Sequence, residues 1–476
     1  MKHAIIFRLV LSCMFCSCIS SVLAQYDSYS LNNYVNPDYM RQSLDFIVGG
    51  QLNNGSSKQT IKQGNNDSFY SSDNFSINGN TEANYNRVKN SASTQNATNI
   101  SFLMDGGFYK SNWETDLVRN NLNSNGTYQF GLSFSNQGYY YRNNQKFILF
   151  TPSAGISVRG QKYKFDDSSV DSYRNKDNFL NANASFRLGL GKGRIEEVGD
   201  ARQAVYILQD LQKQGVLKKE LSNEEIDELA ELITKEKYTR RLDSRIRLIR
   251  EITAIDSFMV AKGYVDDGHS AAYFTSLYDN WQFANVYRKS GNRFIFGIMP
   301  TYQYSGQRSK TVYFNNNDLT QQDTSKNTRL GADLFAGFES EKPINLYWQR
   351  TASIELSFGW EDYKRTKMDR TDSYQTRLTA NYGLGYYPNS RTYISGGIFE
   401  TLAYGFNNDY HTISSLTALR FEMSYYFSPQ FSLNLNYQLG YRYSYQDNKN
   451  TNIGIITDKY KYPANYLFVS LTYSLF

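Results

Sequence analysis

The feature that most limits how this chain can fold is an alternation of apolar and polar residues with a period of two. From Phe431 to Gln446 every odd-numbered residue is Phe, Leu or Tyr, and the residues between them are Ser, Asn, Gln, Gly or Arg. Successive side chains of a β-strand point to opposite faces, so this pattern predicts a strand with one apolar face. About fourteen such segments recur, at 43–53, 73–86, 97–110, 126–140, 146–163, 177–190, 293–305, 328–339, 347–362, 374–387, 391–404, 412–427, 431–446 and 462–476.

The connections between these segments suggest that the strands cross a membrane. Tight turns are expected at 142–145, 341–344, 388–390 and 428–430, and long polar loops at 54–72, 164–176, 306–327, 363–373 and 447–461. Transmembrane barrels have short turns on the periplasmic side and longer loops outside. Aromatic residues gather beside the short turns, which predicts a membrane-interface girdle containing Tyr140, Trp348, Tyr386 and Tyr425. A soluble β-sandwich is the alternative, with the Tyr and Leu faces packed together.

Composition supports the membrane interpretation. Aromatic residues make up 16% of the 476 residues, yet the mean hydropathy is −0.59. After the N-terminus no apolar run approaches the ~18 residues of a membrane-spanning helix. In hydrocarbon each unpaired backbone group costs several kcal/mol, so a spanning β-structure must close into a barrel.

The N-terminus predicts export. Residues 1–24 have the pattern of a cleaved signal peptide: Lys2 and Arg8, an apolar stretch at 9–23, and Val22-Leu23-Ala24 before the expected cleavage. All three cysteines lie in this segment, so the mature chain has no disulfide and no cysteine-ligated metal site. A lipoprotein would need Cys13 or Cys18 as its acylated residue, in a context that fits poorly. The net charge of +6 is too small to indicate nucleic-acid binding.

One segment, 194–285, shows helical spacing instead of alternation. Gly199-Asp200 can begin a first helix, and Ser222 with Glu225 forms a capping box before a second. A third helix is expected at about 239–261 and a fourth through Trp281. The predicted organisation is a signal peptide (1–24), an N-terminal arm (25–42), strands one to six (43–193), a helical insertion (194–285) and strands seven to fourteen (286–476). Six crossings from a periplasmic start put the arm and the insertion in the periplasm.

With these features the chain resembles Gram-negative outer-membrane β-barrel proteins. The resemblance rests on the signal peptide, the alternating strands and the amphipathic last segment that ends in Phe476. It implies a transmembrane antiparallel up-and-down β-barrel of about fourteen strands with a small α-helical insertion. It also implies contact with outer-membrane lipid, and recognition of Phe476 by the barrel-assembly machinery. The apolar residues of the last segment, such as Leu471, fall on the face opposite Phe476, which departs from the family pattern.

The polar faces of the strands are expected to line the lumen. They carry nine charged residues: Arg159, Arg187, Arg329, Asp333, Glu355, Arg377, Arg420, Glu422 and Arg442. Fourteen strands lie between filled eight-stranded barrels and sixteen-stranded channels. We therefore expect a porin-like channel that passes small polar solutes, with mild anion preference because arginines outnumber carboxylates. The alternative is that these residues pair across strands and only hold the wall together.

The sequence offers little support for catalysis. The predicted mature chain contains only two histidines, His269 and His411, and Asp409 beside His411 in a predicted loop is more simply a solvated pair than half of a hydrolase dyad. No metal-ligand spacing is visible, so we expect no enzyme activity, metal or cofactor. Arg240, Arg241 and Arg245 could dock a periplasmic protein or peptidoglycan, which would make the protein an anchor or envelope-assembly factor instead of a channel. Intrahelical ion pairing is the simpler explanation of these charges.

Overall fold

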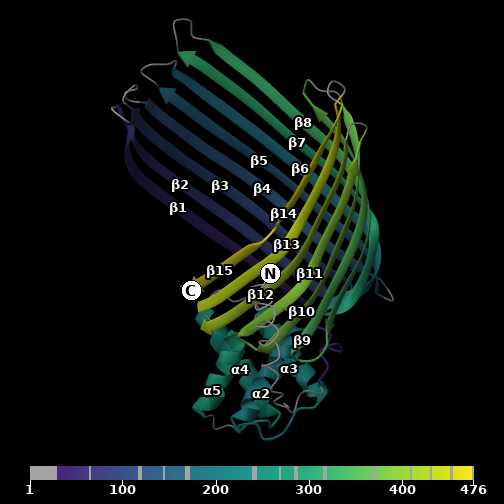
Figure 1. Ribbon diagram of the computed structural model, residues 1–476. Coiled ribbons are helices and arrows are strands. Elements are labelled where there is room, and N and C mark those ends of the chain that lie inside the picture. The colour runs from purple at the N-terminus through teal and green to yellow at the C-terminus, as the bar shows by residue number, and fades with distance from the viewer. Residues whose placement is uncertain are drawn as a thin grey trace, which may run out of the picture.

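The protein is a long antiparallel β-structure with a helical insertion at one end (Figure 1). This computed structural model describes residues 29–473, except 64–65, 116–120, 143–144, 167–171, 239–243, 267–269, 284–287, 315–318, 367–369, 408–409, 429–430 and 451–453. The predicted signal peptide and Phe476 lie outside this range.

From β1 to β14 each strand pairs with its neighbours in the sequence, which is the up-and-down order that the sequence predicts. β14 and β15 follow each other along β13 and together occupy one position, so the sheet has fourteen positions. The strands are β1 (Tyr39–Gln63), β2 (Asn66–Ser91), β3 (Thr94–Thr115), β4 (Asn121–Tyr141), β5 (Lys146–Asp166), β6 (Ser172–Glu197), β7 (Lys289–Phe314), β8 (Thr320–Pro343), β9 (Trp348–Arg365), β10 (Thr371–Asn389), β11 (Thr392–Phe406), β12 (Tyr410–Ser428), β13 (Phe431–Asn450), β14 (Gly454–Pro463) and β15 (Tyr466–Tyr473).

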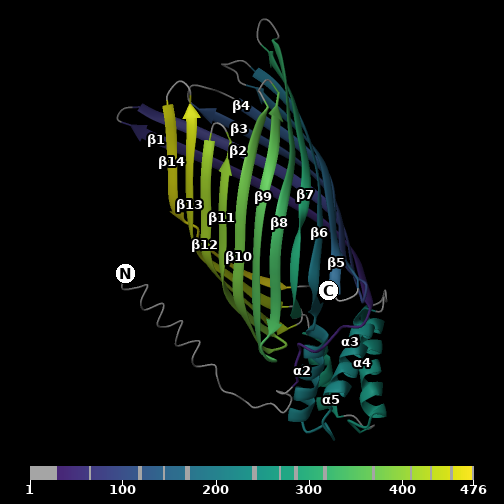
Figure 2. The same cartoon turned by 90° about the vertical axis from the view of Figure 1, so that its right-hand side faces the viewer.

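The long polar loops expected from the sequence are mostly strand. β1 and β2, for example, stay paired from Tyr39 with Asn90 out to Gln63 with Asn66, across the expected loop at 54–72. Strands of 18 to 26 residues, such as β9 and β7, exceed the roughly 10 residues that a tilted crossing needs. The paired strands therefore continue as polar segments beyond the apolar part of the sheet, at the end away from the helices (Figure 2). Alternation could not reveal them because neither face there is apolar.

The helical insertion lies between β6 and β7, as predicted. It comprises α2 (Gly199–Lys213), α3 (Asn223–Tyr238), α4 (Ser244–Ala261) and α5 (Ala271–Gln282). The capping box is confirmed, because the Ser222 N–H donates to Glu225 Oε2 at 2.9 Å and the Glu225 N–H donates to Ser222 Oγ at 3.3 Å. None of the four helices combines the length and the apolar content of a membrane-crossing segment, as far as their described residues extend.

The insertion has its own apolar core, which the N-terminal arm completes. Tyr29, Leu31 and Tyr34 are buried against side chains of the helices. The Tyr29 hydroxyl donates to Asp227, and Thr234 donates to Asn36 at 3.3 Å. The described part of the arm therefore packs on the helices, and β1 begins at Tyr39, before the expected boundary at 43.

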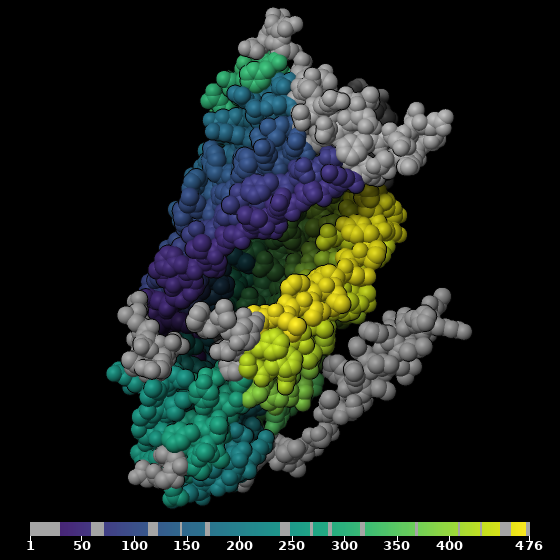
Figure 3. Space-filling model, turned by 90° about the vertical axis from the view of Figure 1, so that its left-hand side faces the viewer, coloured from purple at the N-terminus to yellow at the C-terminus, as the bar shows by residue number. Residues whose placement is uncertain are grey.

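The sheet curls around a hollow, and its first and last strands face each other across a gap (Figure 3). Over the described parts of these strands, β1 pairs only with β2, while β14 and β15 pair only with β13. We call this unpaired junction the seam. The last strand is interrupted at Ala464–Asn465, where the Asn465 side chain accepts a hydrogen bond from the Gly440 N–H at 3.0 Å.

Candidate functional site

The outward face of the sheet is a continuous apolar belt. Residues paired across neighbouring strands share a face, and the pairs Ile77–Phe108, Leu334–Phe358 and Leu419–Leu439 are all large, apolar and exposed. The same register carries the belt onto the last strand, where Leu471 lies opposite Leu433. The belt thus includes Leu467, Val469 and Leu471 of the last strand. The residue that departs from the family pattern is Phe476, which lies outside the described residues.

The predicted girdle residues lie on this outward face, at the end nearest the helices. Trp348 and Tyr386 are paired across β9 and β10 with ring centroids 4.6 Å apart. Tyr425 contacts Phe427 edge-on at 4.9 Å, and the Tyr140 side chain is exposed. Their role at a membrane interface stays a prediction.

The register places all nine predicted lumen residues on the face opposite the belt. Within each strand they have the parity of the polar set: odd in β5 to β10, and even in β12 and β13. Arg329 pairs with Glu361 of the adjacent β9 at 3.7 Å, and Arg420 donates to Gln438 of the adjacent β13 at 3.0 Å. Such bonds fit the wall-stabilising alternative.

Arg187 and Glu355 do more than stabilise the wall. They form an ion pair between β6 and β9, although β7 and β8 lie between these strands in the sheet. The guanidinium of Arg187 lies 3.9 Å above the ring of Phe335, which belongs to β8. A contact that skips two strands is possible only across the concave side of the sheet. The polar face is therefore the interior of the barrel.

An interior cluster of packed side chains occupies the end of the barrel nearest the helices. Its buried apolar members are Tyr139, Phe147, Leu149, Ile295 and Phe335, drawn from β4, β5, β7 and β8. Arg293 of β7 stacks on the Tyr139 ring at 3.7 Å, donates to Gln95 of β3 at 3.1 Å and pairs with Glu339 of β8 at 3.6 Å. These contacts narrow the interior from several sides.

Side-chain hydrogen bonds join β1, β2 and β3 to β6 at the end of the barrel nearest the helices. Arg194 donates to Asn90 Oδ1 at 3.1 Å and to the Ser91 carbonyl at 3.0 Å, joining β6 to β2. Gln95 donates to the Ile195 carbonyl at 2.9 Å, and Tyr39 of β1 donates to Glu197 at 3.1 Å. Direct contacts thus join strands up to five positions apart, and they narrow this half of the interior at this level.

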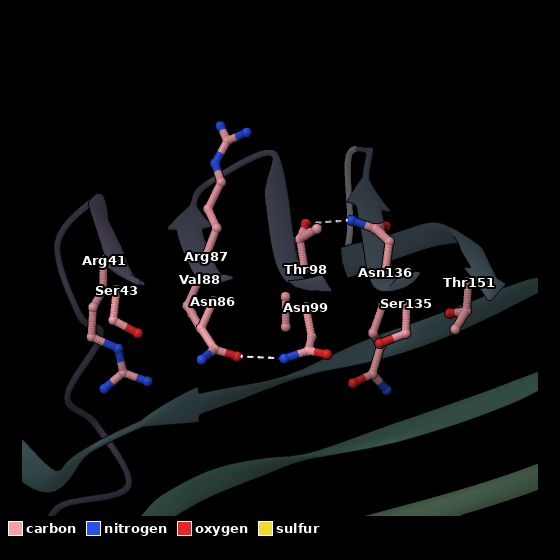
Figure 4. A pocket seen from close by; sticks show the side chains of 12 residues that line it. Arg41, Ser43, Asn86, Arg87, Val88, Thr98, Asn99, Ser135, Asn136 and Thr151 are labelled. Atoms are coloured by element: carbon pink, nitrogen blue, oxygen red, sulfur yellow. Dashed lines mark hydrogen bonds between the residues drawn. The ribbon is translucent and has the colours of Figure 1, made fainter. Parts of the chain in front are cut away.

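Two polar cavities open beside the interior cluster. One, of about 430 Å³, is lined by Gln95, Tyr139, Arg293, Glu339 and Lys289, among others. The other, of about 510 Å³, lies along β1 to β5 (Figure 4). There Asn99 donates to Asn86 at 2.8 Å, whereas the hydrogen bond from Asn136 to Thr98 at 2.7 Å lies on the other face of the sheet. Amide and hydroxyl groups predominate, which suits uncharged polar solutes and water.

Sequence reasoning did not single out the interior cluster. The predicted girdle residue Tyr140 faces outward, whereas its neighbours Tyr139 and Tyr141 pack inside. Strict alternation within β4 could have separated them. The contacts of Arg293 and Arg194 had no sequence signal, because they join strands that are distant in the chain.

Buried arginines fasten the helical insertion to the barrel. Arg288, just before β7, is fully buried and donates to the carbonyls of Leu346, Asn345 and Trp348 and to Gln349 Oε1. Burial lowers the pKa of Arg288 to about 10, and neighbouring Arg202 acts in the same direction. Desolvation raises the pKa of Tyr206 in α2, whose hydroxyl donates to the Tyr387 carbonyl at 3.1 Å.

The remaining predicted sites are placed as follows. Arg240 and Arg241 lie outside the described residues, and the side chain of Arg245, the second residue of α4, is not described either. The docking surface predicted on these arginines stays a prediction. His411 lies in β12, not in a loop, and stacks on Tyr404, whose hydroxyl is 3.3 Å from Nδ1. The expectation for His411 was wrong because β11 and β12 stay paired as far as Phe406 and His411. Asp409 and His269 are not described. No cluster of potential metal ligands occurs in the parts of the chain that the structure describes.

No protein-family model matches the sequence, and no curated protein matches it either. Solved structures give distant likenesses. The ferric yersiniabactin uptake receptor FyuA from Yersinia pestis is 7% identical over 92% of this chain and 71% of that chain, with a TM-score of 0.32. The translocator domain of the autotransporter NalP from Neisseria meningitidis is 8% identical over 82% and 90%, with a TM-score of 0.23. The CymD monoaromatic hydrocarbon channel is 10% identical over 90% and 89%, with a TM-score of 0.22.

Likenesses this distant support no conclusion about function, and the class of protein follows from the structure itself. An up-and-down sheet of fourteen positions with an outward apolar belt and a polar interior has the architecture of an outer-membrane β-barrel protein.

Proposed function

We propose that the protein is an outer-membrane channel for small polar solutes, constricted at the end that carries the helices. The observation that supports this most directly is the register, which separates an apolar outward face from a charged inward face in the part of the sheet that carries the belt. Exposed apolar side chains require hydrocarbon around the barrel, and charged interior side chains require water inside it. The helical insertion and the arm then lie in the periplasm, beneath the constriction.

The constriction sets the expected conductance. The ion pair of Arg187 with Glu355 and the contacts of Arg293 cross the interior, so solute must pass on their far side, along β10 to β14, or displace them. Arginines outnumber carboxylates six to three among the predicted lumen residues on the interior face. The proposal therefore includes a small conductance with mild preference for anions.

Planar-bilayer recording of the mature protein tests this. We expect small single-channel steps for the wild type, a shift of the reversal potential towards the anion value in a KCl gradient, and larger steps for Arg293→Ala. Arg174→Gln is the matched control, because Arg174 lies in the polar extension of β6 on the Phe314 ring, away from the interior cluster. Absence of ion current from correctly folded wild type and Arg293→Ala alike would refute the channel.

A second function is supported by the surface of the insertion. Ile249 in α4 and Phe274 and Tyr278 in α5 are large side chains that are 42 to 59% exposed. Exposed apolar groups of this kind mark interaction sites when they are contiguous, which favours an anchor that holds a periplasmic protein or peptidoglycan. Sedimentation of the detergent-solubilised full chain with peptidoglycan tests this. Phe274→Ser should abolish sedimentation and Val35→Ser, at an exposed site on the arm, should not; no sedimentation of the wild type argues against peptidoglycan.

A further inference from the structure

Both strands that border the seam carry runs of exposed apolar side chains, which therefore lie on both faces of the sheet. In β1, Phe46, Ile47 and Val48 are consecutive and 50 to 79% exposed. In β15, Leu467, Phe468 and Val469 are consecutive and 53 to 62% exposed. Consecutive residues point to opposite faces, so Ile47 and Phe468 point inward while their neighbours belong to the belt.

The inward apolar surface continues along the last strand. Tyr460 and Tyr462 of β14 and Tyr466 of β15 have the same inward parity as Phe468 and are 44 to 57% exposed. On the adjacent β13 the inward positions carry Asn434, Asn436 and Gln438 instead. An exposed apolar strip therefore lines the interior along the unpaired edge of the last strand, with the amides of β13 beside it.

Pairing the two edges would not cover this strip. Closure would satisfy the free N–H and C=O groups of β1 and the last strand, but Ile47 and Phe468 would still face the interior. The interruption at Ala464–Asn465 also removes regular ladder positions in the middle of the last strand. The inward apolar strip is therefore suited to an apolar ligand that enters the interior through the seam from the outward, apolar face of the barrel.

We propose that the seam is a lateral entry site for a lipid-class molecule, whose acyl chain lies on Ile47, Phe468 and the inward tyrosines. The belt brings lipid to both edges of the gap, and the strip continues that apolar surface around the edge into the interior. The amides of β13 offer hydrogen bonds to the polar part of the molecule. This goes beyond passage of polar solutes and does not depend on conductance.

Photo-crosslinking in vesicles tests the site. The photoreactive residue p-benzoylphenylalanine replaces one of three phenylalanines: Phe468 at the seam, Phe358 on the belt, or Phe399, which is inward on β11 under the Arg420 guanidinium at 3.8 Å. The vesicles contain phosphatidylethanolamine and phosphatidylglycerol with a trace of tritiated phosphatidylethanolamine. Resistance of each barrel to SDS before heating confirms folding.

We expect the Phe468 position to label nearly as strongly as Phe358 and about tenfold more than Phe399. Phe468 and Phe399 both point inward, but only Phe468 lies at the seam, where lipid can enter. The Ile47 position should label as well, and Ile47→Asn should reduce labelling at Phe468. If the Phe468 variant does not fold, Tyr466 provides the second inward position. Labelling at the inward seam positions no stronger than at Phe399 would overturn the proposal, whether or not the protein conducts ions.

Discussion

Arg288 offers the sharpest test of how the helical insertion is held to the barrel. Its guanidinium makes four hydrogen bonds to the β8–β9 turn and to β9, and its side chain is fully buried. Each hydrogen bond to a charged group contributes about 1.5–3 kcal/mol. The cost of burying the charge, which also lowers the pKa of Arg288 to about 10, offsets much of that sum. Arg288→Met keeps most of the stem but leaves three carbonyls without this donor, so we expect a loss of about 3–5 kcal/mol.

Hydrogen exchange of the amides in α2 and α5 measures this loss in the detergent-solubilised protein. A loss of 3–5 kcal/mol corresponds to opening that is about two to four orders of magnitude more frequent. The matched control is Arg391→Met, because Arg391 also joins a barrel turn to the insertion, through Asp279, but both partners are more than a third exposed. An exposed pair contributes about 0–1 kcal/mol. Equal protection in the two variants would show that the buried guanidinium does not hold the insertion in place.

Two further predictions concern the helices and the sheet. Hydrogen bonds from the Tyr264 hydroxyl and the Ser222 N–H lower the pKa of the Glu225 carboxyl. The ionised carboxylate therefore stabilises α3 fully above the ordinary pKa of 4.5, and this stabilisation is lost as the pH falls through the lowered pKa. Circular dichroism of Glu225→Gln should lack this acid-dependent loss of helix, and an unchanged acid profile contradicts the assignment. A Cβ at Gly297 would meet the Leu188 carbonyl oxygen at 2.0 Å, whereas one at Gly126 meets nothing within 4 Å. Gly297→Ala should therefore reduce the yield of SDS-resistant barrel, Gly126→Ala should not, and equal yields would refute this packing.

The sequence alone determined the faces of the strands. A period of two is a property of the extended backbone, so the alternation in β13 identified Leu433 as outward and Arg442 as inward without any knowledge of neighbouring strands. Local signals were also sufficient for the capping box at Ser222 and Glu225, because both partners lie within one helical turn. The polar ends of the strands escaped prediction, since residues exposed on both faces show no alternation.

Only the tertiary structure decided which strands meet inside the barrel. The contacts of Arg187 with Glu355 and of Arg293 with Gln95 depend on the curvature of the sheet, and the chain separates these partners by 168 and 198 residues. The seam arises in the same way, because β1 and the last strand lie at opposite ends of the sequence and are brought face to face by the curl of the whole sheet. A local pattern can orient a side chain, but the partner it reaches is fixed by the path of all the strands between them.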